Sequence, residues 1–289
     1  MPELPEVEHI RRTLQPLLVA SVVTDVQLRR RDVVRQRGRV QPRDLLLGAT
    51  VCEVARHGKN LAIIAVDGRT LGVHLGMSGW LSWLEEGAGV SNGERPTDHV
   101  HCIWRIDGPR GRGVLRFRDP RRFGGLWTFG SPDEWRRKRL TSCGPDALTI
   151  KPAALIESLA SSHRPIKAAL LDQSVLAGVG NIYADEALFA AGVHPAMSAH
   201  RFARHPDLVR EFCNQLRAIL RQAIRSGGST IRTYRGVNGD AGTYVRAHQV
   251  YGRAGEPCTR CSFALRSVQL AQRTTVFCPH CQKRSLRAK

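Results

Sequence analysis

The chain has 289 residues, of which 44 are Lys or Arg and 25 are Asp or Glu, so its formal charge is +19 at pH 7. This length predicts one or two domains, and a charge of this size predicts a polyanionic partner. Nucleic acid is the first candidate, with a ribosome-associated role or an anionic membrane surface as alternatives. No run of about 18 apolar residues occurs, which excludes a membrane-spanning helix. The N-terminus lacks the basic and apolar stretches of a secretory signal, so we expect an intracellular protein.

The first predicted elements are a helix and a series of strands. Residues 5–15 show the spacing of an amphipathic helix, which Pro16 is expected to end. From about 21 to 130 the pattern changes to short apolar or alternating runs between turn residues, which predicts an antiparallel sandwich or barrel. The glycine-rich segment 85–97 predicts a surface loop. Examples of these strand-like runs are 22–28, 50–56, 60–66, 70–75, 100–106, 113–118 and 125–129.

Helical patterns dominate after about residue 132. The clearest covers 206–226 and is closed by Gly227 and Gly228, since glycine readily takes the left-handed conformation that ends a helix. The segment 235–243 is rich in turn residues and is expected to be irregular and mobile. The apolar stripe of the 206–226 helix consists of Leu208, Phe212, Leu216, Ile219 and Ala223.

The eight cysteines fall into an isolated group and a paired group. In a reducing compartment, isolated cysteines are expected to act as small buried hydrophobic residues. The isolated ones are Cys52, Cys102, Cys143 and Cys213. The others form a C-x2-C-x16-C-x2-C pattern, which is the spacing of a tetrahedral zinc site on a short β-hairpin. Four thiolate ligands leave no open position on the metal, so the pattern predicts one structural Zn²⁺. Its ligands are Cys258, Cys261, Cys278 and Cys281.

The chain start offers a nucleophile. Removal of Met1 would leave the secondary amine of Pro2 at the terminus, and an α-amino group titrates near pH 8, about two units below a lysine. Such an amine can attack an electrophilic sugar carbon and give an iminium, while Glu3 can transfer protons. The alternative is a chance Met-Pro start followed by acids in the first turn of a helix. The start alone does not decide between them.

Six segments, taken together and in order, carry a family resemblance. They are PELPEVE at 2–8, HLGMSG at 74–79, DPRRFGG at 119–125, LLDQSVLAGVGNIYADEALF at 170–189, GGST at 227–230, and VYGRAGEPC with RTTVFCPHCQ between 250 and 282. Over nearly its whole length the chain resembles the formamidopyrimidine-DNA glycosylases of the Fpg/Nei family.

The resemblance implies an α+β fold in three parts. These are an N-terminal antiparallel β-sandwich with a flanking helix at 1–131, a helix-two-turn-helix domain at 132–244 and a C-terminal zinc-finger β-hairpin at 245–289. The implied enzyme excises oxidised purines such as 8-oxoguanine and formamidopyrimidines from duplex DNA and then nicks the strand. The expected partner is damaged double-stranded DNA, bound by a monomer in the bacterial cytoplasm and nucleoid, without a membrane. The alternatives are a Nei-type glycosylase for oxidised pyrimidines and a non-catalytic zinc protein that binds DNA.

The resemblance also assigns catalytic roles. It places the nucleophilic proline at Pro2, the proton-donating glutamate at Glu3 and the lysine that serves β-elimination at Lys59. Arg273, between the two cysteine pairs, corresponds to an arginine that contacts the phosphate beside the lesion and assists δ-elimination. Without the resemblance, Lys59 and Arg273 would be read as ordinary surface charges.

A further group of residues is expected to hold the DNA. By resemblance, Met77, Arg121 and Phe123 fill the gap left by a nucleotide that has swung out of the helix, and apolar wedges are a known means of holding a base stack open. His99 corresponds to another DNA contact.

A phosphate site is expected at a predicted helix start. Gly178 and Gly180 precede Asn181 there, and backbone N–H groups at such a start bind phosphate oxygens readily, although Asn181 can equally be a simple cap. Lys167 is expected to add a charge nearby.

Overall fold

The structure is a computed structural model that describes residues 2–36, 38, 40–86, 99–229 and 236–284. It consists of two compact units, one formed by residues 1–141 with 224–243 and the other by residues 142–223 with 244–289. The division expected at residues 131 and 244 stays a prediction. The loop expected at 85–97 lies almost entirely outside the described residues.

The first unit begins with helix α1, Leu4–Leu18. Pro5 stands in its first turn, where its missing N–H and fixed φ suit a helix start. The expectation that Pro16 ends the helix is wrong, because the helix continues to Leu18. A proline in the last turn removes one hydrogen bond only, and the next turn still closes, since the N–H of Val19 donates to the Gln15 carbonyl at 3.1 Å.

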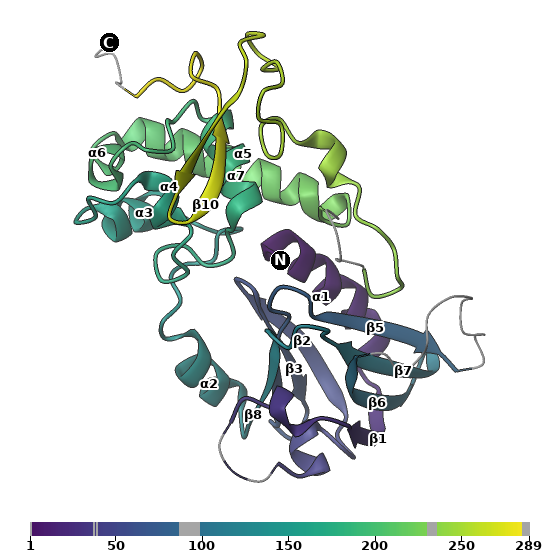
Figure 1. Ribbon diagram of the computed structural model, residues 1–289. Helices are drawn as coiled ribbons and strands as arrows, with labels where there is room; N and C mark the ends of the chain where they lie inside the picture. Colours follow the sequence, from purple (N-terminus) through teal and green to yellow (C-terminus); the bar gives the residue numbers. More distant parts are fainter. Residues whose placement is uncertain (1, 37, 39, 87–98, 230–235, 285–289) are drawn as a thin grey trace. The chain divides into compact units, whose positions relative to one another are not determined.

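Two antiparallel sheets form the body of this unit (Figure 1). The first sheet contains β1 (Val22–Leu28), β6 (Val100–Gly108), β7 (Gly111–Arg118) and β5 (Trp80–Glu85), in that order. The second contains β2 (Val51–His57), β3 (Asn60–Ala65), β4 (Thr70–His74) and β8 (Gly125–Phe129). The sandwich and all the expected strand positions are confirmed, while β5 is an additional strand. Short helical segments complete the unit: η1 (Arg31–Val33), η2 (Pro42–Leu45), α2 (Pro132–Trp135) and η3 (Arg136–Leu140).

One apolar core joins the helix to both sheets. Val7, Ile10, Leu14 and Leu18 of α1 belong to the same buried cluster as Trp104 and Phe117 of the first sheet and Leu61 and Val73 of the second. Burying a side chain of this size stabilises the fold by about 1.5–3 kcal/mol relative to leaving it exposed. The core therefore fixes α1, and with it the chain start, on the sandwich.

The second unit is mostly helical. Its elements are α3 (Pro152–Leu159), α4 (Ile166–Leu170), α5 (Asn181–Ala190), α6 (Ala199–Ala203), most of α7 (Pro206–Arg225), η4 (Tyr244–Ala247), β9 (Arg266–Leu270) and β10 (Arg273–Phe277). The helix expected at 206–226 is confirmed as α7, but its buried stripe is rotated slightly. Val209 and Leu220 are fully buried where Leu208 and Ile219 were expected. Among the described residues, the helices are too short or too polar to cross a membrane.

β9 and β10 form a tight hairpin. Leu270 pairs with Arg273, so only Ala271 and Gln272 make the turn, and both have positive φ angles, 48° and 58°. Two such residues are what a type I′ hairpin turn requires, although glycine or asparagine is the usual choice. The turn places Arg273 at the first position of β10, with its side chain exposed.

Candidate active site and zinc centre

The chain start is held by the carboxylate of Glu6. One of its oxygens accepts the backbone N–H of Glu3 at 2.7 Å, and the other accepts the backbone N–H of Ser229 at 2.7 Å. Glu6 is 1% exposed, so both bonds lie away from solvent, where hydrogen bonds to a charged group are strong. One side chain thus fixes the backbone next to Pro2 and joins it to a segment more than two hundred residues away.

Gly228 makes this approach possible. It has a φ of +83°, and a Cβ there would lie 2.7 Å from Cγ of Glu6. Any larger residue would be strained and would displace the carboxylate. The GGS part of the GGST motif is therefore explained by close contact with α1.

The segment after this motif is anchored where it is described. The indole N–H of Trp80 donates to the Gly236 carbonyl at 3.0 Å, and the N–H of Trp83 donates to the Val237 carbonyl at 3.0 Å. Val237 is also part of the sandwich core. Gly236 and Val237 of the expected 235–243 loop are therefore held by β5, and the mobility of the loop stays a prediction. Residues 230–235 lie outside the described residues.

Lys59 lies in the two-residue turn between β2 and β3, where His57 pairs with Asn60. Its exposed fraction is 7%, which is low for a lysine in a hairpin turn. The structure therefore removes the main objection to a functional role, namely that Lys59 is ordinary solvated surface. Lys59, Pro2 and Glu3 all belong to the first unit.

The residues expected to wedge into DNA occupy two neighbouring loops. Met77 is 37% exposed and Phe123 is 54% exposed, which is unusual for large apolar side chains. The guanidinium carbon of Arg121 lies 4.4 Å from the ring centre of Phe123, so the two side chains stack. His99 is exposed in a left-handed conformation, with a φ of 58°.

The buried carboxylate of Asp119 joins these loops. It accepts the hydroxyl of Ser78 at 2.6 Å and the backbone N–H of Gly124 at 2.7 Å, and its own N–H donates to the His99 carbonyl at 3.1 Å. The loops also touch directly, since a Cβ on Gly76 would lie 2.4 Å from the Gly124 nitrogen. Asp119, which sequence reasoning missed, therefore sets the spacing between Met77 and Phe123.

In the second unit, Lys167 is not a surface residue. Its side chain is fully buried, with its ammonium 2.7 Å from a carboxylate oxygen of Asp185. The ammonium also donates to the Thr275 hydroxyl at 2.8 Å and to the Thr274 carbonyl at 3.1 Å. The ammonium is thus held by partners inside the protein, and the expectation that its charge adds to the nearby phosphate site stays a prediction.

The helices and the zinc hairpin are joined by further polar contacts. Asn181, the first residue of α5, donates its amide to the Thr274 carbonyl at 3.1 Å. Asp185 accepts the N–H of Val276 at 3.1 Å. Glu186 accepts the N–H groups of residues 249, 250 and 251 at 2.8–3.1 Å. The sequence signal for these contacts was the pair of adjacent acids, Asp185 and Glu186, in a mostly apolar helix. The contacts hold Arg273, the residue before Thr274, at the hairpin tip.

Burial acts strongly on Asp185. It raises the pKa of this carboxyl to about 7, against the lowering influence of Lys167. A buried pair of this kind is balanced between the cost of removing two charges from water and their attraction at close range. Its partners across the hairpin give it a role in placing β10 rather than in adding stability.

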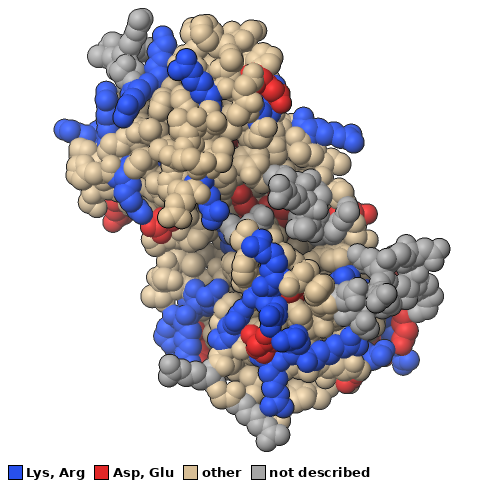
Figure 2. All heavy atoms as spheres, viewed as in Figure 1, with Lys and Arg blue, Asp and Glu red and all other residues tan. Residues whose placement is uncertain are grey.

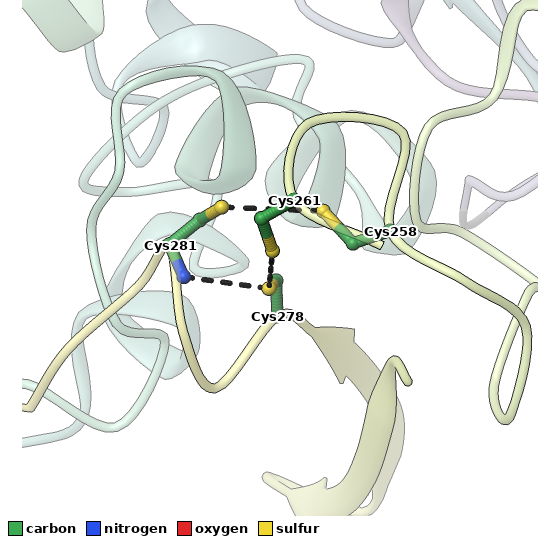
Figure 3. Close-up of side chains that lie close together, drawn as sticks. All are labelled: Cys258, Cys261, Cys278 and Cys281. Atoms are coloured by element: carbon green, nitrogen blue, oxygen red, sulfur yellow. Dashed lines mark hydrogen bonds between the residues drawn. The ribbon is translucent and has the colours of Figure 1, made fainter. Parts of the chain in front are cut away.

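The four cysteines of the predicted zinc site converge (Figure 3). All four sulfur atoms lie within 4.8 Å of one another, with 3.5 Å between Cys261 and Cys278 and 4.0 Å between Cys258 and Cys281. A tetrahedron with Zn–S bonds of about 2.3 Å has sulfur–sulfur edges of about 3.8 Å, so these residues fit zinc. The N–H groups of Arg260 and Cys281 point at two of the sulfurs, at 3.4 and 3.3 Å, and such bonds stabilise thiolates.

Basic side chains are spread over both units on the face shown in Figure 2, where acidic side chains are fewer. Several exposed arginines of the first unit, such as Arg30, Arg105 and Arg112, are paired with single aspartates. Surface pairs of this kind contribute little to stability, so the surplus charge acts mainly through its long-range attraction for anions.

Family models match three parts of the chain. The model for the formamidopyrimidine-DNA glycosylase N-terminal domain matches residues 1–126, that for its H2TH domain matches 143–235, and that for the zinc finger found in FPG and IleRS matches 255–284. A formamidopyrimidine-DNA glycosylase from Geobacillus kaustophilus is 37% identical over 98% of this chain and 100% of its own length. The chain belongs to the formamidopyrimidine-DNA glycosylase family.

Solved structures agree with this membership. A point mutant of the Lactococcus lactis FPG, in complex with DNA containing Fapy-dG, matches with a TM-score of 0.85 and 32% identity over 98% of this chain and 100% of its own. The MutM (Fpg) protein from Thermus thermophilus matches with a TM-score of 0.82 and 36% identity over 99% and 100% of the two chains. The family resemblance, the fold class and the structural zinc site are confirmed.

The zinc site yields a first prediction. Cys258→Ser should unfold the zinc hairpin, because a structural zinc contributes on the order of 10 kcal/mol to such modules. Limited proteolysis and metal content should show cleavage within 249–282 and loss of one zinc per chain. The matched control is Cys52→Ser, since Cys52 is exposed and outside the cluster. Full protease resistance in the metal-free protein would contradict a structural role.

The Asp119 contacts yield a second prediction. Asp119→Asn keeps the shape of the side chain but replaces one acceptor oxygen with a donor, which leaves either the Ser78 hydroxyl proton or the Gly124 N–H without its acceptor. Urea unfolding should show a loss of about 1–3 kcal/mol, the usual cost of one unsatisfied buried group. Asp107→Asn is the control, because Asp107 is half exposed and paired with Arg112 at the surface. Equal stability of the two variants would mean that Asp119 does not join the loops.

The Lys167–Asp185 pair yields a third prediction. Lys167→Met should destabilise the second unit by about 3–5 kcal/mol, because it leaves the carboxylate buried without its cation. The double variant Lys167→Met with Asp185→Leu should recover part of this loss, since neither charge then remains. Thermal unfolding of the two variants measures the difference. Wild-type stability in Lys167→Met would show that the ammonium reaches solvent.

Proposed function

We propose that this protein is a bifunctional DNA glycosylase and abasic-site lyase that removes oxidised purines, including 8-oxoguanine and formamidopyrimidines. The observation that carries the proposal is the Glu6 clamp, which holds the backbone beside Pro2 on a buried helix instead of leaving a frayed terminus. A fixed terminal amine has little structural use and an obvious catalytic one. Family membership supports the same assignment.

The proposed reaction begins at the sugar of the damaged nucleotide. With Met1 removed, the Pro2 nitrogen carries a usable lone pair and forms a bond to C1′. The bond from C1′ to the base breaks, and the base leaves with a proton supplied through Glu3. The C1′–O4′ bond of the sugar ring then breaks, O4′ takes up the proton lost from the Pro2 nitrogen, and the product is an iminium between Pro2 and the opened sugar.

Strand cleavage follows from this iminium. Loss of a proton from C2′ breaks the C3′–O bond, and a second elimination, with loss of a proton from C4′, breaks the C5′–O bond, so phosphate remains on both sides of a gap. Lys59 is proposed to handle protons in the first elimination and Arg273 to assist the second. Water finally hydrolyses the iminium and restores the free amine of Pro2.

The proposed partner is damaged duplex DNA, bound by a monomer in the bacterial cytoplasm. The exposed side chains of Met77 and Phe123 suit a wedge that fills the space of an extruded nucleotide. Arg121 offers only hydrogen-bond donors, which match the O2 and N3 acceptors of an orphaned cytosine. His99 and the N-terminal end of α5 at Asn181 are proposed as further DNA contacts.

Strand-cleavage assays test the function. Under single-turnover conditions the protein should cut duplexes that contain 8-oxoguanine opposite cytosine much faster than duplexes that contain dihydrothymine or no damage. Glu3→Gln should reduce 8-oxoguanine excision by about 10²–10⁴-fold, the usual contribution of a general acid, yet retain cleavage at a preformed abasic site. The control is Glu53→Gln, because Glu53 is exposed on β2.

Two outcomes would contradict the proposal. Faster cleavage at dihydrothymine than at 8-oxoguanine would assign the protein to the pyrimidine-specific type. No cleavage of any damaged duplex by zinc-loaded protein would indicate a DNA-binding protein without catalysis.

A further inference from the structure

One face of α1 is attached to β2 by polar side chains. Glu8, Arg11 and Gln15 are spaced three and four residues apart and therefore share a face of the helix. Gln15 accepts the N–H of Val54 at 3.1 Å, and Arg11 donates to the carbonyl of the same residue at 3.4 Å. Glu8, nearest the chain start, pairs with Arg56 instead. The three contacts fix how α1 lies along the strand.

Arg56 continues this connection into the turn that carries Lys59. Its Nε donates to Glu8 at 2.9 Å, and its Nη1 donates to the Gly58 carbonyl at 2.9 Å. The side chains of Arg56 and Glu8 are only 7% and 6% exposed. The Gly58 carbonyl belongs to the peptide bond that leads into Lys59. Because that peptide unit is planar, holding its oxygen fixes the backbone from which the Lys59 side chain extends.

Glu8 is a suitable anchor for this arrangement. Burial alone would raise the pKa of Glu8, but hydrogen bonds from Arg11, Arg12 and Arg56 outweigh burial and lower it to about 2. The carboxylate is therefore ionised at every pH at which the enzyme could work. Its contribution to stability is present above the ordinary pKa of 4.5 and is lost only as the pH falls toward 2.

We propose that Arg56, held by Glu8, is a positioning residue that sets Lys59 relative to the nucleophile at the start of α1. This inference rests on the proposed function, in which Pro2 and Lys59 act on the same sugar. The guanidinium fork is essential to it, because one planar group must donate in two directions at once. A lysine at position 56 would keep the charge and lose the second donor direction.

The test separates the elimination step from the step that forms the covalent intermediate. The substrate is a duplex with one preformed abasic site, and single-turnover nicking and borohydride trapping are measured for Arg56→Lys. Nicking should slow by about 10–100-fold, the scale expected for a misplacement of about 1 Å, while trapping stays near the wild-type level. The pH profile of nicking should also shift, since the proposed base is displaced.

Two further variants complete the design. Glu8→Gln should reproduce the nicking defect by releasing Arg56, and its combination with Arg56→Lys should be no worse than either change alone. Arg12→Lys is the control, because Arg12 also pairs with Glu8, at 2.7 Å, but its side chain is 53% exposed, whereas that of Arg56 is buried. It should nick at the wild-type rate.

The outcomes are distinguishable. Wild-type nicking by Arg56→Lys and Glu8→Gln, with active wild-type protein, would overturn this inference alone. A parallel fall in nicking, trapping and melting temperature would also overturn it, because the residues would then be structural only. Failure of the wild-type protein to nick the abasic duplex would remove the proposed function, and this inference with it.

Discussion

The structure depends on one buried carboxylate near the chain start. Terminal residues are usually poorly ordered. A terminal amine that acts as a nucleophile must instead be held in a fixed position. Glu6 achieves this by accepting one N–H from Glu3 and one from Ser229, and Gly228 lets it come close. The apolar face of α1 then ties the same helix to the sandwich core. Order at Pro2 is thus a consequence of tertiary structure and not of local propensity.

Buried acids have a common role in this strongly basic chain. Glu6 and Glu8 hold α1, Asp119 holds the wedge loops, and Asp185 and Glu186 hold the zinc hairpin. In each place the acid binds backbone N–H groups or a buried cation. Many basic side chains therefore remain on the surface, where a surplus of positive charge attracts DNA within about a Debye length. The buried acids thus fix the positions of the helix, the loops and the hairpin, and the exposed basic side chains attract DNA.

Much of the fold could be predicted because its signals are local. The short, mostly apolar runs at 22–28 and 125–129 mark β1 and β8, and the C-x2-C pairs mark the zinc site. β5 was not among the expected strands because the polar Ser82 interrupts its apolar run, although Leu81, Ser82 and Trp83 are all buried. Its backbone at Trp83 also pairs with Val237, a distant segment. The periodicity of apolar residues in a short segment does not reveal contacts with distant segments of the chain.

The candidate site shows the same limit. The motifs pointed to Pro2, Lys59 and Arg273, but the residues that hold them in place were not visible in the sequence. The burial of Lys167 could not be predicted, because its partner Thr275 lies 108 residues away in the sequence, on the hairpin. The roles of Arg56 and Asp119 likewise depend on partners on other elements.

The central claim is that the clamped Pro2 nitrogen is the nucleophile. Mass spectrometry of peptides from the borohydride-reduced protein–DNA adduct tests it most directly. The account predicts that the sugar is attached to Pro2 at the terminus of a chain that lacks Met1. Attachment to Lys59, or efficient trapping by a protein that retains Met1, would contradict it.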